Sequence, residues 1–529
     1  MTGGGHLFVT AGDLTLLACD AVLIPTDRAF HITDAFAPIV GLDGAGVLGG
    51  QQWLDSHVVR LDGHVDRPHV WLADVVSGHG DDQWNVALAE SFLSGAVSAL
   101  GETVTTGARP LLAMPVLGTG AGGQEHRSGA VASSLIDALQ HAVQMHGVDV
   151  VLVTRGRPAY SAAQRVRFGV LGDDSPDDAF DLGDEERDRH LTAAAGELAR
   201  NARRGELVLF LGAGVSAGAG LPAWQTLIDG LARQLPTDRR PRLEQLHRLD
   251  LRDQAAVLRR RFPDEDSFHQ HLQAQIDHTR HGLTHELAAS LPTVEAVTTN
   301  YDTLFEQAVA ATLDTIAVLP GQPAMTADRW LLKLHGDIGD ASSMVLTRED
   351  YLRLPKSGGA LFGLVQAMLM TRHMMFVGYS LSDEDFHSLV DEVRAAQAGA
   401  GRTEPFGTVL TLFEDELFND LWEGDLTVLA MHAEPADPAG PSDQEFAVAA
   451  RRLQIFLDLL GMLAAHHQAF LLNPSYDEML TGEERRVRDA LENLIAARPK
   501  DAGVEWEQVD ALLSALGRPA TSSAAPRRT

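Results

Sequence analysis

A run of glycines directly after an apolar segment is the first feature of the sequence with evident chemical capacity. Residues 207–211 are all apolar, which predicts a short strand buried on both faces. Gly212, Gly214 and two further glycines follow, and residues without a Cβ let the backbone approach a ligand closely. Apolar residues then recur at helical spacing over 224–235, so the loop leads into a helix whose amides could bind a phosphate. The alternative is a tightly packed turn without a ligand.

Three further apolar or β-branched runs end in residues of catalytic types. Because ligands bind at the carboxyl ends of strands in a parallel sheet, we expect these residues to meet around one crevice. Asp302 has a local alternative, since a carboxylate at its position could cap the next helix. A lone histidine at a strand end often has a structural role. The residues are Thr298, Thr299, Asn300 and Asp302 after 294–297, His335 and Gly336 after 330–334, and Gly378, Tyr379 and Ser380 after 374–377.

Parallel strands must position these residues, and the pattern of the chain predicts an α/β fold class. We expect two α/β domains, the second with a helical insertion, followed by a C-terminal helical segment. In the first domain the expected strands are 21–24, 69–76, 110–115 and 148–153, and the expected helices are 85–100 and 129–145.

The second domain and the flanking segments follow from composition and periodicity. Residues 243–281 have a charged helical pattern, which predicts a helical insertion over the pocket, and 344–346 predicts a short strand. The Asp- and Glu-rich segment 172–189 predicts a solvated spacer. The expected boundaries are an α/β domain at 1–171, an acidic linker and helix at 172–199, the second α/β domain at 200–433, helices at 434–515 and a disordered tail at 516–529.

The bulk composition is that of a multidomain globular protein. It is 45% hydrophobic and 22% charged over 529 residues. A net charge of -31 repels phosphate backbones and argues against nucleic acid as a direct ligand. Cys19 is the only cysteine, which excludes an internal disulfide and a CxxC zinc site and fits the reducing cytoplasm. We expect no signal peptide and no membrane span, because polar residues interrupt the apolar run 453–472.

Two segments of the first domain, 11–24 and 114–123, resemble a macro domain. Both carry a Gly-containing loop next to a predicted strand, the first as Gly-Asp-Leu-Thr and the second as Gly-Thr-Gly-Ala-Gly-Gly. Macro domains usually carry Asn-Ala-Ala-Asn where this chain has Ile24, Pro25, Thr26 and Asp27, which disfavours hydrolysis of ADP-ribose adducts and leaves nucleotide sensing or a structural role. The resemblance implies a second nucleotide site, with Asp13 and Leu14 at the adenine and Gly118, Thr119, Gly120 and Ala121 around the diphosphate.

Four ordered segments of the second domain resemble the sirtuin domain. They are the glycine loop up to Trp224, the Thr-Asn-Tyr-Asp segment 299–302, the His-Gly pair at 335–336 and Gly-Tyr-Ser-Leu-Ser at 378–382. Sirtuin deacylases carry a four-cysteine zinc module, which this chain cannot build. Glutamine usually stands where Thr299 is found, and Gly-Thr-Ser becomes Gly-Tyr-Ser. The chain is therefore more similar to the prokaryotic sirtuin-like NAD hydrolases of antiphage defence, including Thoeris-type effectors and related defence sirtuins.

This second resemblance implies an NAD+ hydrolase that releases nicotinamide and ADP-ribose or a cyclic product. Asn300 would position the ribose and water, Asp302 would bind the carboxamide and His335 would act as general base. NAD+ is the substrate, and no metal is implied. The implied NAD-binding residues are Gly212, Ala213, Gly214, Ser216, Pro222, Trp224, Thr299, Gly378, Tyr379 and Ser380.

An unregulated NAD hydrolase would poison its host, as in abortive infection. We therefore expect control through a homo-oligomer, through a partner protein of a defence system, or through an ADP-ribose-like nucleotide at the first domain. Two alternatives stay open. One is a non-enzymatic module that binds and senses NAD or ADP-ribose, which the altered residues around both loops favour. The other is an NAD-dependent protein deacylase, which would use the same pocket.

Overall fold

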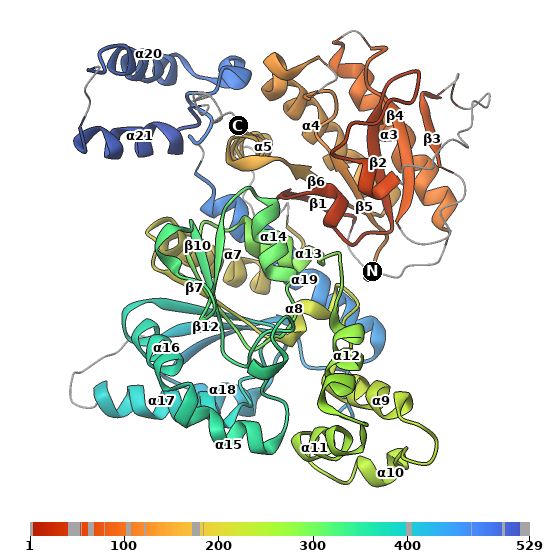
Figure 1. Cartoon of the computed structure of the whole chain (residues 1–529). Coiled ribbons are helices and arrows are strands. Elements are labelled where there is room, and N and C mark those ends of the chain that lie inside the picture. Colours follow the sequence, from red (N-terminus) through yellow and green to blue (C-terminus); the bar gives the residue numbers. More distant parts are fainter. Residues whose placement is uncertain are drawn as a thin grey trace, which may run out of the picture.

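The computed structural model describes most of the chain. The described residues are 4–40, 53, 56–61, 68–78, 80–101, 107–120, 123–171, 180–183, 185–397, 405–466, 468–499 and 503–518. The predicted α/β class is confirmed, with two separate sheets and a C-terminal set of helices (Figure 1).

The first sheet is built by the N-terminal part of the chain, drawn in red and orange in Figure 1. Its six strands lie in the order β1-β6-β5-β2-β4-β3, and only the β3–β4 pair is antiparallel. Apolar residues of two helices, α3 (Asp82–Leu100) and α4 (Ser128–His146), bury one face. The strands are β1 (Leu7–Ala11), β2 (Ala21–Thr26), β3 (Val58–Arg60), β4 (His69–Asp74), β5 (Leu111–Pro115) and β6 (Asp149–Thr154).

The second sheet has seven strands, all parallel, in the order β13-β12-β11-β7-β8-β10-β9. All five residues of β7 are buried, as the 207–211 segment predicted, while the edge strands β9 and β13 are only partly buried. β7 lies between β11 and β8, so the glycine loop at its end lies beside the ends of both neighbours. The strands are β7 (Leu207–Leu211), β8 (Glu295–Thr298), β9 (Ile316–Leu319), β10 (Arg329–Lys333), β11 (His373–Val377), β12 (Gly407–Phe413) and β13 (Leu426–His432).

Helices surround this sheet and extend from it. Four of them, α9 (Trp224–Gln234), α10 (Leu243–Leu246), α11 (Leu251–Arg261) and α12 (Glu265–Ile276), form a helical unit with its own apolar core. The last three of these helices lie within the insertion predicted at 243–281, and α9 is the helix expected after the glycine loop. The remaining helices of the region are α8 (Ala213–Ala217), α13 (Leu283–Ser290), α14 (Leu304–Ala311), α15 (Arg348–Ser357), α16 (Gly359–Thr371), α17 (Glu384–Gln397) and α18 (Glu416–Trp422).

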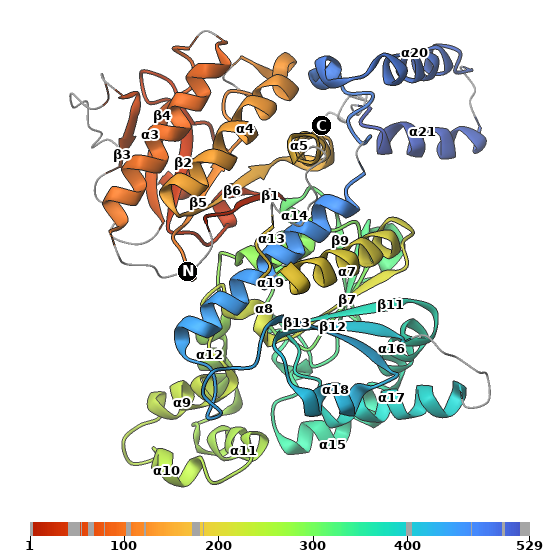
Figure 2. The ribbon, with the colours of Figure 1, turned by 180° about the vertical axis from the view of Figure 1, so that it is seen from behind.

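One long helix, α19 (Asp443–Ala464), joins the two sheets. It begins with a capping box between Ser442 and Glu445, runs beside α7 (Glu185–Arg203), and also contacts β1, β12 and α13 (Figure 2). Asp458, which interrupts its apolar run, is fully buried and binds Arg167 of α5 (Gly156–Leu171) through two hydrogen bonds of 2.7 and 2.8 Å. Asp458, which interrupts an apolar run in the sequence, therefore forms an ion pair that links α19 to the N-terminal domain.

Two expectations from the sequence are wrong. The spacer 172–189 is not wholly solvated, because Phe180 and Leu182 are buried and α7 already begins at Glu185; residues 172–179 lie outside the described range. Residues 344–346 form no strand. Met344 and Leu346 instead pack into the core of the helical insertion, so helices bury the apolar residues that suggested a strand.

The C-terminal part continues with η5 (Pro474–Met479), α20 (Gly482–Ala496) and α21 (Glu505–Ala515), which lie apart from the central sheet in both views (Figures 1 and 2). They match the helices expected there, while the expected tail beyond residue 518 lies outside the described residues. Among the helices described, none has the length and apolar character that a membrane crossing requires.

Candidate functional site

The glycine loop and the end of β11 interlock through their backbones. Gly212 donates its N–H to the carbonyl of Val377 at 3.0 Å, and Gly214 donates to the carbonyl of Gly378 at 2.9 Å. A Cβ on Gly214 would lie 2.8 Å from the Cα of Gly378, and one on Gly212 would overlap Gly378 and Tyr379. Glycine is therefore required here by close backbone contact, in addition to whatever the loop binds.

A cavity of about 580 Å³ opens at the carboxyl ends of the central strands. Its volume lies in the usual range for small-molecule sites, and it lies at the crevice where α/β sheets bind ligands. Most of the predicted site residues of this domain line it, while Gly212, Thr298 and Gly336 do not. The predicted residues that line it are Ala213, Gly214, Ser216, Pro222, Trp224, Thr299, Asn300, Asp302, His335, Gly378, Tyr379 and Ser380.

Three of these side chains form a hydrogen-bonded group in the pocket wall. Ser216 donates its hydroxyl to the Asp302 carboxylate at 2.9 Å, and Asn300 donates from Nδ2 to Ser216 Oγ at 3.2 Å and to the carbonyl of Gly212 at 3.0 Å. The other oxygen of Asp302 accepts the N–H of Leu304 at 3.1 Å. Asp302 therefore accepts the N–H of the first residue of α14 from the position before the N-cap residue Thr303, close to the capping role that the sequence suggested, and it also lines the cavity.

His285 of α13 extends this group and was missed in the sequence. Its Nε2 lies 3.3 Å from Ser216 Oγ, and its side chain is buried. Burial, together with the nearby His281, lowers the pKa of His285 to about 3. The ring is therefore neutral at physiological pH, and it serves as a hydrogen-bonding partner of Ser216 rather than as a cation.

His335 also lines the cavity and has two carboxylates near it, those of Asp383 and Asp385. Its Nε2 is 3.3 Å from Asp383 Oδ2, and its ring meets the ring of Tyr351 edge-on. Burial lowers the pKa of His335, while the charge of Asp383 opposes that shift. Burial and the charges of Asp383 and Glu384 raise the pKa of Asp385 to about 6. A neutral imidazole next to a carboxylate can accept a proton from water or a sugar hydroxyl.

His335 and the two carboxylates beside it have the composition of a metal site, and among the described residues this is the group that does. His335, Asp383 and Asp385 offer ligand atoms that all lie within 4.8 Å of one another. The sequence did not single out Asp383 or Asp385, although both follow the Gly-Tyr-Ser-Leu-Ser segment directly. A carboxylate just after a strand end in a parallel sheet is the signal that could have revealed them.

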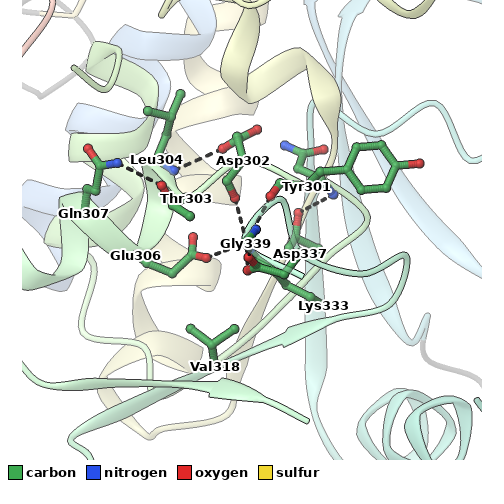
Figure 3. Close-up of polar contacts among 12 residues, drawn as sticks. Tyr301, Asp302, Thr303, Leu304, Glu306, Gln307, Val318, Lys333, Asp337 and Gly339 are labelled. Atoms are coloured by element: carbon green, nitrogen blue, oxygen red, sulfur yellow. Dashed lines mark hydrogen bonds and ion pairs between the residues drawn. The ribbon is translucent and has the colours of Figure 1, made fainter. Parts of the chain in front are cut away.

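Lys333, the last residue of β10, fixes the loop that carries Asn300 and Asp302 (Figure 3). Its ammonium group donates to the carbonyls of Asp302 at 2.7 Å and Tyr301 at 3.2 Å. Two carboxylates balance its charge, Asp337 at 2.6 Å and Glu306 at 2.7 Å. Burial raises the pKa of Glu306, and this effect is larger than the opposing effect of the Lys333 ammonium group, which stabilises the carboxylate.

The helical insertion closes one side of the cavity. Arg252 of α11 lies over the ring of Tyr351 at 5.3 Å and binds the carboxylates of Asp250 at 3.2 Å and Glu384 at 3.3 Å. Arg348 binds Asp253 through two hydrogen bonds of 2.8 and 2.9 Å. These ion pairs attach the insertion to α15 and α17 beside the pocket.

The residues of the predicted second nucleotide site lie at two strand ends of the N-terminal sheet. Asp13 follows β1, where its carboxylate accepts hydrogen bonds from Thr15 at 2.7 and 3.0 Å and from Arg155 at 2.6 Å, while Leu14 is buried. Gly118, at a φ of +75°, follows β5, and Gln124 donates its N–H to the carbonyl of Gly118. Thr119 and Gly120 continue this loop, and Ala121 lies outside the described residues.

The central domain thus has the arrangement of a Rossmann-like nucleotide-binding domain, with a glycine loop and polar strand ends around one crevice. Residues 294–427 match the model of the SIR2-like domain. This matched segment contains Asn300, Asp302, His335 and Gly378.

Curated relatives match part of the chain at modest identity. The NAD(+) hydrolase ThsA of Enterococcus faecium is 27% identical over 202 residues, which cover 36% of this chain and 40% of the relative. Defense-associated sirtuin 2 of Bacillus subtilis is 26% identical over 228 residues, covering 40% of this chain and 21% of the relative. The NAD(+) hydrolase ThsA of Bacillus cereus is 26% identical over 199 residues, covering 36% and 40%. The chain therefore spans well under two thirds of the length of these relatives.

Proposed function

We propose that the central domain is an NAD+ hydrolase that cleaves the bond between nicotinamide and ribose. The observation that carries this proposal is the convergence of Asn300, Asp302, Ser216 and His335 on one cavity at the strand ends of a Rossmann-like sheet. The SIR2-like match and the names of the relatives, two of them NAD(+) hydrolases, agree with it.

In this proposal the glycine loop holds the pyrophosphate, and Gly378, Tyr379 and Ser380 lie along the adenosine. Ser216 has a second role, because its hydroxyl ties Asn300 to Asp302. The amide of Asn300 then orients the ribose and the attacking water, and Asp302 binds the carboxamide. Holding these groups in one geometry supplies much of the rate enhancement of such a reaction.

The chemical step follows from the charge of the substrate. Water forms an O–C1′ bond while the C1′–N bond breaks. The electron pair of the broken C1′–N bond stays on the nitrogen and neutralises the pyridinium, so nicotinamide leaves uncharged. The proton of the water goes to the neutral imidazole of His335, and Asp383, 3.3 Å away, stabilises the imidazolium that forms. His335 then passes this proton to solvent. No metal takes part in these steps.

The product assay separates the three functions that the sequence left open. Purified chain is incubated with NAD+, with and without an acetyl-lysine peptide, and nicotinamide, ADP-ribose and deacetylated peptide are quantified by chromatography. Nicotinamide with ADP-ribose or its cyclic form, independent of peptide, supports hydrolysis. Peptide-dependent turnover indicates a deacylase, and tight NAD+ binding without turnover indicates a sensor.

The biological role we propose is that of an antiphage effector that depletes NAD, with control by the N-terminal domain. Asp13 and Gly118 follow strands β1 and β5 of one sheet, and the position of Gly120 is open, since a Cβ there meets no atom within 4 Å. An ADP-ribose-like nucleotide is the ligand proposed for these loops. Calorimetry of the full chain with ADP-ribose tests it, and a Gly120→Trp variant, which fills the open position, is expected to lose that heat.

Assembly into a homo-oligomer completes the proposal. α20 buries none of its fifteen residues, and apolar side chains of α20 and α21 are exposed, among them Val487 at 52% and Leu512 at 55%. We propose that these side chains form the contact between copies of the chain. Light scattering of the wild-type chain and of a Val487→Asp variant tests this surface. A smaller mass for the variant supports a homo-oligomer. If both are monomers, the homo-oligomer is excluded, and a partner protein of a defence system would be the occupant of this surface.

A further inference from the structure

α13 is a short helix enclosed between the two domains. All eight of its residues are buried, including the polar residues Thr284, His285, Glu286 and Ser290. It contacts β1 of the N-terminal sheet on one side and α8 of the glycine loop and α14 on the other. Leu283 and Thr284 also line a second cavity whose wall includes Gly214, so this helix backs the glycine loop directly. Buried polar residues on a helix require partners, and those of α13 lie in both domains.

On the N-terminal side the contacts reach the end of β1. Ala11 donates its N–H to Ser290 Oγ at 2.9 Å, and Thr10 donates its hydroxyl to Glu286 Oε1 at 3.1 Å. A Cβ on Gly12 would overlap the Glu286 carboxylate, so this side chain lies against the backbone that leads to Asp13. Glu286 therefore packs against the loop after β1, which contains Asp13 and is proposed to bind a nucleotide.

On the other side the contacts reach the NAD pocket. His285, the residue before Glu286, has its Nε2 3.3 Å from Ser216 Oγ. Ser216 in turn binds Asp302 and accepts from Asn300. One helical turn therefore connects the end of β1 with the side chains proposed to hold the ribose and carboxamide.

We propose that α13 couples the N-terminal domain to the NAD pocket, with Glu286 as the positioning residue that sets the placement of His285 and Ser216. This inference rests on the proposed function for its kinetic consequence. A shift of the β1 loop moves Glu286, and the rigid helix carries His285 with it, which changes how Ser216 holds Asn300 and Asp302. His285 and Glu286 are adjacent residues of a fully buried helix, so a displacement of Glu286 also displaces His285.

Three variants of the full chain test the coupling. Thr10→Val removes only the hydroxyl that binds Glu286, and Glu286→Gln keeps the shape of the side chain while removing its charge. Arg157→Gln is the control, because it breaks another contact between the domains, the ion pair with Asp314 at 2.8 Å, while Asp314 keeps Arg329, which donates to the carbonyl of Ala289 in α13 at 2.8 Å. We expect kcat/KM for NAD+ to fall about fivefold in the first two variants and less than about twofold in the control. If folded Thr10→Val and Glu286→Gln match the control, the proposal is overturned.

A double-mutant cycle separates coupling from a general loss of stability. In a Ser216→Ala background, the group that receives the signal is gone, so Thr10→Val is expected to change kcat/KM less than about twofold. An undiminished effect would show that Thr10 acts by another route. Hydrogen exchange of residues 212–217 gives a readout independent of catalysis: Thr10→Val should accelerate it and Arg157→Gln should not. If the wild type releases no nicotinamide, the proposed function fails, whereas unchanged exchange in Thr10→Val overturns the coupling itself.

Discussion

The ammonium group of Lys333 donates to the main-chain carbonyl of Asp302 at 2.7 Å, across from β10 to the loop that follows its neighbour β8. Lys333 is the register partner of Thr298, so its side chain starts beside the end of β8 and extends to the loop that follows this strand. The same group binds Glu306 and Asp337 (Figure 3). A buried cation thereby fixes the backbone from which Asn300 and Asp302 project.

Replacing Lys333 should destabilise the protein and inactivate it. Lys333→Met leaves the buried carboxylate of Glu306 without its cation, which should lower the free energy of unfolding by about 3–5 kcal/mol. Urea denaturation measures this. The double variant Lys333→Met/Glu306→Gln removes the unpaired charge. It should recover part of the lost free energy of unfolding but not the activity. A single variant as stable as the wild type would contradict the role of Lys333.

The buried His285 predicts a pH dependence of stability. Its pKa is lowered to about 3, so below pH 6.5 the unfolded chain takes up a proton that the folded chain refuses. Stability from this group is complete above pH 6.5 and is lost as the pH falls toward 3. Between pH 7 and pH 5 the wild type should lose about 2 kcal/mol more than His285→Gln, whose side chain stays neutral. Denaturant titrations at both pH values compare the two; equal losses would show that His285 titrates normally when folded.

The pair of His335 and Asp383 predicts the direction of a kinetic shift. Asp383 raises the pKa of the buried imidazole against the effect of burial. In Asp383→Asn that opposition is gone, so the pKa of His335 falls and the acid limb of kcat/KM for NAD+ should move to lower pH. Asp391→Asn is the matched control, because Asp391 is an exposed carboxylate of α17, the helix that begins directly after Asp383. If the acid limb stays at the same pH or moves to higher pH, Asp383 does not influence the general base in the way proposed.

Removal of metal ions should leave the reaction unchanged. In the proposed mechanism His335 accepts a proton, so it cannot serve at the same time as a ligand with Asp383 and Asp385. Dialysis against EDTA followed by the nicotinamide assay should change the rate less than about twofold. A loss that Mg²⁺ or Mn²⁺ restores would instead make these three residues a metal site.

Much of the site was predictable because its chemistry follows strand ends. The glycine loop and the residues Asn300, Asp302, His335 and Gly378 come directly after apolar runs, and parallel strands bring such positions together. Local sequence was sufficient because each signal lies within a few residues of its strand.

The residues that were missed depend on contacts between distant parts of the chain. His285 stands in a short helix, and only packing of α13 on α8 brings it to Ser216. Lys333 left a signal, a single charge within the apolar run 330–334, but its partners come from the segment 301–306 and from Asp337. Residues 344–346 looked like a strand because local apolar and β-branched content does not reveal whether helices or strands will bury it.

The most direct test of the account is the rate of nicotinamide release from NAD+ by the purified full chain, compared among the wild type, Asn300→Ala and Asn419→Ala. Asn419 is exposed on α18, away from the pocket residues, and controls for the substitution itself. The account predicts release by the wild type and by Asn419→Ala, and a loss of at least about 100-fold in Asn300→Ala with an unchanged fold. Full activity of Asn300→Ala, or no release by any of the three, would contradict the assignment of this pocket as an NAD+ hydrolase site.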